Sequence, residues 1–275
     1  MSNSEETTTN PSATEVAQPV VPVGAFCWWE LGTTDTAGAK DFYTKLMDWT
    51  YFDAPMGDTG EVYTMFRVGD KDAAAMYKMG QDMVSQGVPP NWLSYVLVNN
   101  ADESAAKITE NGGTLMAGPF DVMDFGRMAV ARDPQGAAFA IWQAGTHIGA
   151  SLVNQVGGNC WNELHTSDAA GAKAFYGAVF GWVGEDQPMG PMVYTMLKNT
   201  NGGNVGGMMQ MTEEWGNIPP HWMPYTWVAD CDAAAAKVEG LGGKLIEKPM
   251  DVTGVGRMAI VQDPQGAVSA IIRLA

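Results

Sequence analysis

The chain contains two copies of one module. Residues 27–49 read CWWELGTTDTAGAKDFYTKLMDW, and residues 160–182 read CWNELHTSDAAGAKAFYGAVFGW, so 13 of 23 positions are identical at a shift of 133. Residues 126–137 and 256–267 share nine of twelve positions. Background identity is roughly one position in fifteen to twenty, so this similarity reflects internal duplication. Any ligand site should therefore occur twice, at equivalent positions.

Length and composition fit two modules of ordinary globular size. The 275 residues are 46% hydrophobic, which allows two modest cores. We expect a disordered polar tail over 1–22, module 1 over 23–143, a connector over 144–158 and module 2 over 159–275. No apolar run approaches the roughly 18 residues needed to span a bilayer, and the start of the chain does not have the pattern of a signal peptide. A cytoplasmic protein is the default expectation.

The charge balance limits the partners. With 31 acidic against 15 basic residues, the formal net charge is −16. Binding to nucleic acid or to an anionic membrane depends on clustered Lys and Arg, so neither is expected. The predicted partner is a small molecule, and the predicted assembly is a monomer or a homodimer.

The three cysteines do not suggest a disulfide framework. Cys27 and Cys160 occupy equivalent positions in separate modules, and Cys231 is left over. We expect Cys27 and Cys160 to be small buried apolar residues that lie under the first helix of each module.

Each module has the same order of predicted elements. An extended apolar stretch leads to Asp35 or Asp168, which should cap an Ala-rich amphipathic helix. Short strands and a second Ala-rich helix follow. The module ends in two strands joined by the turn DPQG at 133–136 and 263–266, with Pro and Gly where a type I or II turn favours them. The predicted order is β-α-β-β followed by β-α-β-β, or nearly so.

The opening of each module, a strand followed by Asp, six or seven residues and Phe-Tyr, and its Asp-Pro-x-Gly hairpin resemble the vicinal oxygen chelate superfamily, which includes glyoxalase I, bleomycin-resistance proteins and extradiol dioxygenases. The resemblance covers nearly all of the chain after the tail, and the tandem arrangement is similar to two-module glyoxalase-like proteins of bacteria. It implies an α+β fold in which each module pairs βαβββ units into a curled sheet around a cup. The same fold hosts isomerases, lyases, dioxygenases and binding proteins, so it does not specify the chemistry.

The resemblance also implies a divalent metal, but this sequence departs from the family pattern. The family's three ligand positions in each module carry Trp28, Leu93 and Ala140, or Trp161, Met223 and Ala270. None of these side chains offers the imidazole, carboxylate or thiolate that a transition metal needs. We therefore predict no metal at these positions and no cofactor, with a divalent metal at other positions left open.

Three histidines are the remaining donors of interest. His147 falls in the connector, and His165 and His221 fall in module 2, none at a family ligand position. A lone His is more often a hydrogen-bonding residue of the surface or core than a functional one. His221, at the start of a strand beside Trp222, is the one most worth locating.

Side chains alternate along a strand, so Trp28 shares a face with Phe26 and Glu30. Trp161 likewise shares a face with Asn159 and Glu163, and family geometry turns this face into the cup. The predicted ligand-binding residues are Trp28, Trp161, Tyr95, Tyr225, Trp142 and Trp227, and the candidate general bases are Glu30 and Glu163. Burial should raise the pKa of these two carboxyls, unless Arg127 or Arg257 pairs with them.

Less specific interpretations stay open. Stripes of Trp and Tyr are core packing more often than ligand walls, and a duplicated Glu–Arg pair is equally typical of a structural salt bridge. Three functions remain. The favoured one is a metal-independent protein that binds a small, partly aromatic or apolar molecule in its cups. The second is a lyase, isomerase or hydroxylase with Glu30 or Glu163 as base, and the third is a structural or partner-binding module whose pockets Trp28 and Trp161 collapse.

Overall fold

The computed structural model describes residues 20–57, 60–190 and 192–275, so residues 1–19 of the predicted tail lie outside the described part. Module 1 contains β1 (Phe26–Thr33), α1 (Thr36–Met47), β2 (Thr50–Pro55), β3 (Val62–Val68), β4 (Lys71–Lys78), α2 (Gln81–Ser85), β5 (Asn91–Leu97), α3 (Ala101–Glu110), β6 (Thr114–Val122), β7 (Gly126–Arg132) and β8 (Ala138–Ala144). Module 2 contains β9 (Asn159–Thr166), α4 (Ala169–Phe180), β10 (Val183–Met189), β11 (Met192–Lys198), β12 (Asn204–Gln210), η1 (Glu213–Trp215), β13 (His221–Trp227), α5 (Cys231–Val238), η2 (Glu239–Leu241), β14 (Lys244–Val252), β15 (Gly256–Gln262) and β16 (Val268–Leu274).

Each module forms one mixed sheet of eight strands. In module 1 the order is β2-β3-β4-β1-β5-β8-β7-β6, and module 2 repeats it as β10-β11-β12-β9-β13-β16-β15-β14. β1 pairs in parallel with β4, β5 pairs in parallel with β8, and the antiparallel pair β1–β5 joins the two halves. Each sheet is therefore two βαβββ units side by side, and the α+β fold predicted from the resemblance is confirmed.

The first helices begin where the sequence predicted. The Asp35 carboxylate accepts hydrogen bonds from the backbone N–H groups of Ala37 and Gly38, and the Asp168 carboxylate accepts one from Gly171. These bonds satisfy N–H groups that have no partner inside the helix, so each Asp fixes the start of its helix.

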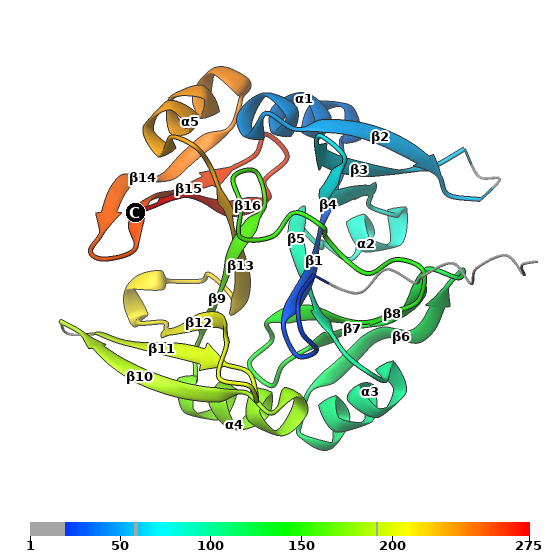
Figure 1. Cartoon of the computed structure of the whole chain (residues 1–275), viewed down its shortest axis with the longest axis vertical. Coiled ribbons are helices and arrows are strands. Elements are labelled where there is room, and N and C mark those ends of the chain that lie inside the picture. The colour runs from blue at the N-terminus through cyan, green and yellow to red at the C-terminus, as the bar shows by residue number, and fades with distance from the viewer. Residues whose placement is uncertain (1–19, 58–59, 191) are drawn as a thin grey trace, which may run out of the picture.

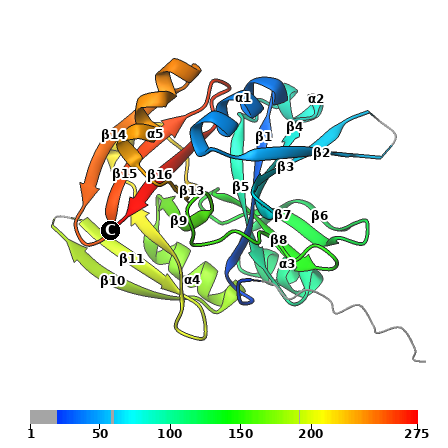
Figure 2. The ribbon, with the colours of Figure 1, turned by 45° about the horizontal axis from the view of Figure 1, so that its top comes forward.

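The two sheets turn their concave faces away from each other. The hairpins β2–β3 and β6–β7 extend to one side, while β10–β11 and β14–β15 extend to the other (Figures 1 and 2). Between the sheets, α1 of module 1 packs against α5 of module 2, and α3 packs against α4 (Figure 1). We call the hollow of module 1 cup 1 and the hollow of module 2 cup 2.

The convex faces of the central strands form the contact between the modules. The indole Nε1 of Trp29 on β1 donates to Oδ1 of Asn162 on β9 over 2.7 Å, and both residues are buried. Asn162 is the counterpart of Trp29 at the shift of 133, so equivalent positions meet at the pseudo-twofold axis. Buried residues of both modules form one continuous core, which joins the two sheets into a single body.

The connector packs against both modules. Gly157 donates its N–H to the carbonyl of Trp227 in module 2 and accepts, through its own carbonyl, a bond from the indole of Trp49 in module 1. Leu152 is buried between them. Among the described residues, no helix is long and apolar enough to cross a bilayer.

A β-bulge at the start of β1 and of β9 corrects part of the predicted alternation. Pairing skips Cys27 in module 1, and in module 2 it skips Cys160, with Trp161 opposite Tyr225 and Asn159 opposite Thr226. The extra residue reverses which face the preceding side chain occupies.

The bulges change the positions of the side chains at and before them. Phe26 packs its ring 4.9 Å from that of Trp222 at the contact between modules, and Asn159 accepts a hydrogen bond from Asn162, so neither lines a cup. Cys160 lines cup 2 instead of lying under a helix. Cys27 is buried, but the connector covers it, with the N–H of Ala150 on its carbonyl.

Candidate functional site

A hydrogen-bonded cluster forms the floor of cup 1. Trp28 and Glu30 lie two residues apart on β1, with Tyr95 on β5 and Tyr63 on β3. The Tyr95 hydroxyl donates to Oε2 of Glu30 over 2.6 Å, and the Tyr63 hydroxyl also donates to Glu30. The Trp28 indole donates to the Tyr63 oxygen over 3.0 Å. Glu30 is thus held by two phenols, one of which is positioned by the neighbouring indole.

Cup 1 surrounds Glu30 with aromatic and neutral groups. Burial raises the pKa of Glu30 above its usual range, although the hydroxyls of Tyr95 and Tyr63 act in the opposite direction. Trp142 donates from its indole to the carbonyl of His147 over 2.9 Å, and the His147 ring lies 4.7 Å from that of Trp28, edge to face. Burial lowers the pKa of His147, so this wall is neutral at physiological pH.

Cup 2 repeats the floor cluster. The Tyr194 hydroxyl donates to Oε2 of Glu163 over 2.8 Å, and the Tyr225 hydroxyl donates to Oε1 over 2.9 Å. The Trp161 indole donates to the Tyr194 oxygen over 2.8 Å. Trp28, Glu30, Tyr63 and Tyr95 correspond one by one to Trp161, Glu163, Tyr194 and Tyr225 in the two copies.

Cup 2 also has a chain of histidines that cup 1 does not share. Nε2 of His165 lies 2.7 Å from Oε1 of Glu163, and Nδ1 of His165 lies 3.0 Å from Nε2 of His221. Nδ1 of His221 lies 2.9 Å from the carbonyl oxygen of Pro219. The chain therefore runs Glu163, His165, His221, Pro219.

The Pro219 carbonyl fixes the protons of this chain. A carbonyl only accepts, so His221 must carry its proton on Nδ1, which leaves Nε2 of a neutral His221 as an acceptor. Nδ1 of His165 must then donate to it. One further proton must lie between Nε2 of His165 and Glu163, because two lone pairs would repel at 2.7 Å. The pair is therefore an imidazolium facing a carboxylate, or its neutral tautomer.

The surroundings favour the charged pair. Burial by itself would raise the pKa of Glu163, but the hydrogen bond and charge of His165, with the hydroxyls of Tyr194 and Tyr225, outweigh it and hold this pKa below its usual range. Burial, followed by the positive charge of His165, lowers the pKa of His221, which keeps that ring neutral. The same carboxyl is thus shifted in opposite directions in the two cups.

The residue two places after each floor carboxyl decides which cup has the chain, and small residues make room for the tyrosines nearby. Gly32 occupies the place of His165 in module 1, and a Cβ there would lie 3.0 Å from the Tyr77 hydroxyl, so Tyr77 fills that space. In module 2 the strand beside β9 carries Gly207, and a Cβ there would overlap the Tyr194 ring. The two cups have the same carboxylate floor but different neighbours above it.

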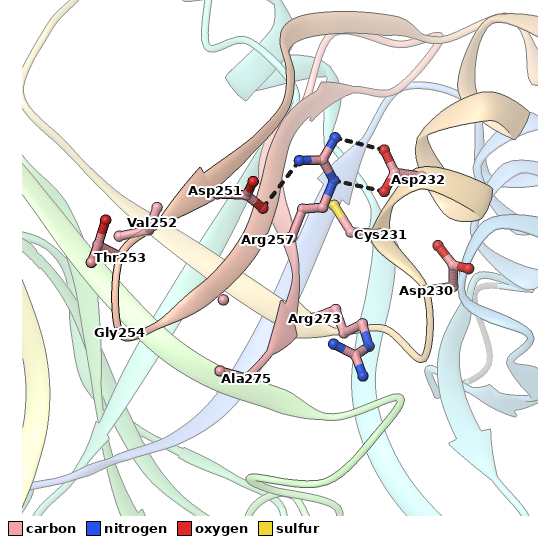
Figure 3. A pocket seen from close by; sticks show the side chains of 11 residues that line it. Asp230, Cys231, Asp232, Asp251, Val252, Thr253, Gly254, Arg257, Arg273 and Ala275 are labelled. Atoms are coloured by element: carbon pink, nitrogen blue, oxygen red, sulfur yellow. Dashed lines mark hydrogen bonds and ion pairs between the residues drawn. The ribbon is translucent and has the colours of Figure 1, made fainter.

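The predicted Glu–Arg alternative is wrong. In module 1, Arg127 binds Asp102 and Asp121. In module 2, Arg257 binds Asp232 and Asp251, and these three residues line a pocket that is separate from the cup (Figure 3). Each arginine joins a helix start to a hairpin of its own module. The phenols, and in cup 2 His165, are the partners of the cup carboxyls instead.

Both cups are open and have apolar rims. Residues of both cups, Trp28 and Trp161 among them, line a hollow of about 3130 Å³. Exposed apolar side chains on the long hairpins line the mouths: Phe52, Met116, Phe120 and Met123 in module 1, and Met189, Met192, Ile246 and Met250 in module 2.

Five of the six predicted ligand-binding residues line the cups. These are Trp28, Tyr95, Trp142, Trp161 and Tyr225. Trp227 is not among the lining residues, and its backbone bonds instead to Gly157 and Gly158. The sequence reasoning missed Tyr63 and Tyr194, although the repeated YTM motif in both copies was a usable signal.

The residues at the family's metal positions do not fit a metal. Trp28, Leu93 and Ala140 offer no donor atom toward cup 1, and their counterparts in cup 2 offer none either. Across the part of the chain that the structure describes, no group of three or more His, Cys, Asp or Glu side chains is arranged to hold a metal ion. Glu163, His165 and His221 bind one another in sequence and do not converge on one point.

The fold and the site define a class of two-module protein with curled sheets. Each module has an aromatic cup with a carboxyl on its floor. Comparison with known proteins agrees with it. The chain belongs to the Glyoxalase/Bleomycin resistance protein/Dioxygenase superfamily, whose model matches residues 26–141 and 154–270.

Relatives resemble the whole chain. CFP32 of Mycobacterium bovis, which carries a provisional glyoxylase name, is 40% identical over 247 residues, covering 90% of this chain and 93% of that protein. The anthracycline biosynthesis protein DauV of Streptomyces sp. (strain C5) is 34% identical over 264 residues, covering 91% and 94%.

Solved structures share the fold at low identity. The Mn(II)-bound glyoxalase of Novosphingobium aromaticivorans has a TM-score of 0.61 at 13% identity, covering 91% of this chain and 82% of that chain. The 2,3-dioxygenase LapB of Pseudomonas sp. KL28 has a TM-score of 0.62 at 11% identity, covering 91% and 93%.

Proposed function

We propose that this protein binds a small, partly aromatic or apolar molecule in its cups, with aromatic floors at the positions where the superfamily usually holds a metal. The observation that carries the proposal is the repeated cluster of indole, two phenols and carboxyl at the floor of each cup. A planar ligand would stack on the indole of Trp28 or Trp161, and the carboxyl would bind its polar group.

The apolar rims support the proposal. Methionine side chains adapt to irregular ligand shapes, and exposed apolar patches mark binding sites more often than chance surface does. The name of DauV refers to the biosynthesis of anthracyclines, which are planar and polycyclic. An anthraquinone is therefore a suitable first probe for the cups of this chain.

Calorimetric titration of the full chain with an anthraquinone tests the proposal. Trp28→Leu and Trp161→Leu should each weaken binding about tenfold, because stacking and apolar area are lost. Trp227→Leu is the matched control, since Leu97 is its natural counterpart in module 1 and Trp227 does not line a cup. Binding that is insensitive to Trp28 and Trp161 would reject the cups as the site.

A second candidate is an enzyme, in which Glu163 acts as a general base. The chain of His165 and His221 favours this candidate in cup 2, because its hydrogen bonds connect the carboxylate of Glu163 to the carbonyl oxygen of Pro219. Glu30, whose pKa is raised by burial, is the candidate base of cup 1.

A further inference from the structure

The carboxyl on the floor of cup 2 has an acceptor position that no described residue uses, and its pKa is shifted in the opposite direction to that of Glu30. Oε1 of Glu163 accepts from Tyr225 and His165, while Oε2 accepts only from Tyr194 among the described residues. One lone pair of Oε2 is therefore unused, and Glu163 lines the cup. Trp161 stands two residues away on the same strand and offers an aromatic face.

The histidine chain keeps this acceptor ionised. His165 is buried between Glu163 and His221, and its hydrogen bond, acting against burial, helps to hold the pKa of Glu163 below its usual range. A carboxylate accepts a stronger hydrogen bond than a neutral carboxyl, and a hydroxyl is a strong donor to it. The partners of Glu30 among the described residues are the hydroxyls of Tyr95 and Tyr63, so its carboxyl gains no such help from a histidine.

We propose that cup 2 selects aromatic ligands that carry a hydroxyl, such as phenols, which stack on Trp161 and donate the hydroxyl proton to Oε2 of Glu163. Cup 1 takes aromatic ligands without this selection. The inference rests on the proposed function, and it assigns different ligand chemistry to the two cups. His165 and His221 are positioning residues, which act through Glu163.

Other titratable groups do not compete for this role. Tyr194 and Tyr225 keep their protons at neutral pH because burial raises the pKa of each phenol, and burial raises the pKa of the Cys160 thiol to about 12. Glu214 of η1 lines the wall of the cup, next to Trp215, whose ring packs 4.7 Å from that of His165. Glu163 is therefore the carboxyl on the floor of cup 2, beside Trp161, while Glu214 lies on its wall.

Paired probes test the inference on the full chain. 2-Naphthol and 2-methoxynaphthalene have the same ring, but only the first donates a hydroxyl. The wild-type protein should bind 2-naphthol at least about tenfold more tightly, the difference expected for one hydrogen bond to a charged group. Glu163→Gln should remove this preference, and the matched Glu30→Gln should leave it unchanged. If Glu163→Gln keeps the preference for 2-naphthol, or if Glu30→Gln loses it, the inference is overturned.

A pH profile tests the positioning role of His165. Because His165 lowers the pKa of Glu163, the wild-type preference should persist into acid, and His165→Gln should lose it at a higher pH. A structural role alone would change affinity for both probes equally, with no shift in the profile, and that result would reject the role of His165.

Histidine NMR provides a test that needs no variant. The chain has three histidines, with His147 in cup 1 and His165 and His221 in cup 2. Substoichiometric 2-naphthol should shift the ring signals of His165 and His221 before that of His147, and the reverse order overturns the inference. If neither naphthalene binds, the inference fails, whereas the proposed function fails only if the anthraquinone does not bind either.

Discussion

The hydroxyl of Tyr43 on α1 donates to Oδ2 of Asp263 in the last hairpin of module 2, over 3.1 Å. The reciprocal bond, from Tyr176 to Asp133, measures 3.0 Å. The Tyr of the FY motif and the Asp of the DPQG turn, which mark each module in the sequence, thus bind each other across the seam. Oδ1 of each Asp meanwhile accepts from the backbone of its own turn.

Tyr43→Phe should lower the free energy of unfolding by about 1 to 3 kcal/mol, because the buried Asp263 and the Trp92 indole both lose a partner. Urea denaturation measures the change. Tyr51→Phe is the control, since that ring is half exposed on β2. Equal stability of the two variants would contradict a bond between modules.

The two cup carboxyls should respond differently to removal of charge. The pKa of Glu163 is lowered, so its contribution to stability is present above the ordinary Glu pKa and is lost as pH falls through the folded value. The pKa of Glu30 is raised, so its contribution is greatest in acid and declines as pH rises through the folded value.

At pH 7, Glu163→Gln should therefore cost about 3 kcal/mol, since it breaks a buried pair with His165, while Glu30→Gln should cost much less. The difference between the two losses in free energy of unfolding should be smaller in acid. Denaturation of both variants at pH 7 and pH 4 checks this, and equal losses at pH 7 would show that the two carboxyls are equivalent.

Gly207→Ala should disturb the floor of cup 2. The new methyl group would overlap the Tyr194 ring and move its hydroxyl away from Glu163, at a cost of about 1 to 3 kcal/mol. Gly203→Ala, whose methyl group would meet Asn199 at an ordinary 3.5 Å, is the control, in the turn just before β12. Thermal melting compares the two, and a harmless Gly207→Ala would mean that Tyr194 lies elsewhere.

Elemental analysis of the purified protein tests the departure from the family's metal site. We expect no stoichiometric divalent metal at Trp28, Ala140, Trp161 or Ala270, because these side chains offer no donor. Treatment with a chelator should leave the melting temperature and anthraquinone binding unchanged. About one tightly bound Zn, Ni, Fe or Mn per module, with function lost on chelation, would contradict this and favour an enzyme.

The sequence by itself determined the duplication, the helix caps and the DPQG turns, because each depends on residues close together in the chain. It also placed Trp28 and Glu30 on one face of a strand, since alternation is local. It did not reveal the bulges at Cys27 and Cys160, because a bulge depends on pairing with β5 or β13, and so Phe26 and Asn159 were placed on the wrong face.

Only the tertiary structure decided the partners of the cup carboxyls. Tyr63 and Tyr194 reach them from a strand that is two places away in the sheet, and His221 meets His165 across 56 residues of sequence. The arginines expected there bind aspartates of their own module instead. Repeated sequence fixed the same floor in both cups, and alternation along the strand already places Gly32 or His165 on the face of each carboxyl. Folding added the phenols and His221, and in their company the two carboxyls have opposite shifts in pKa.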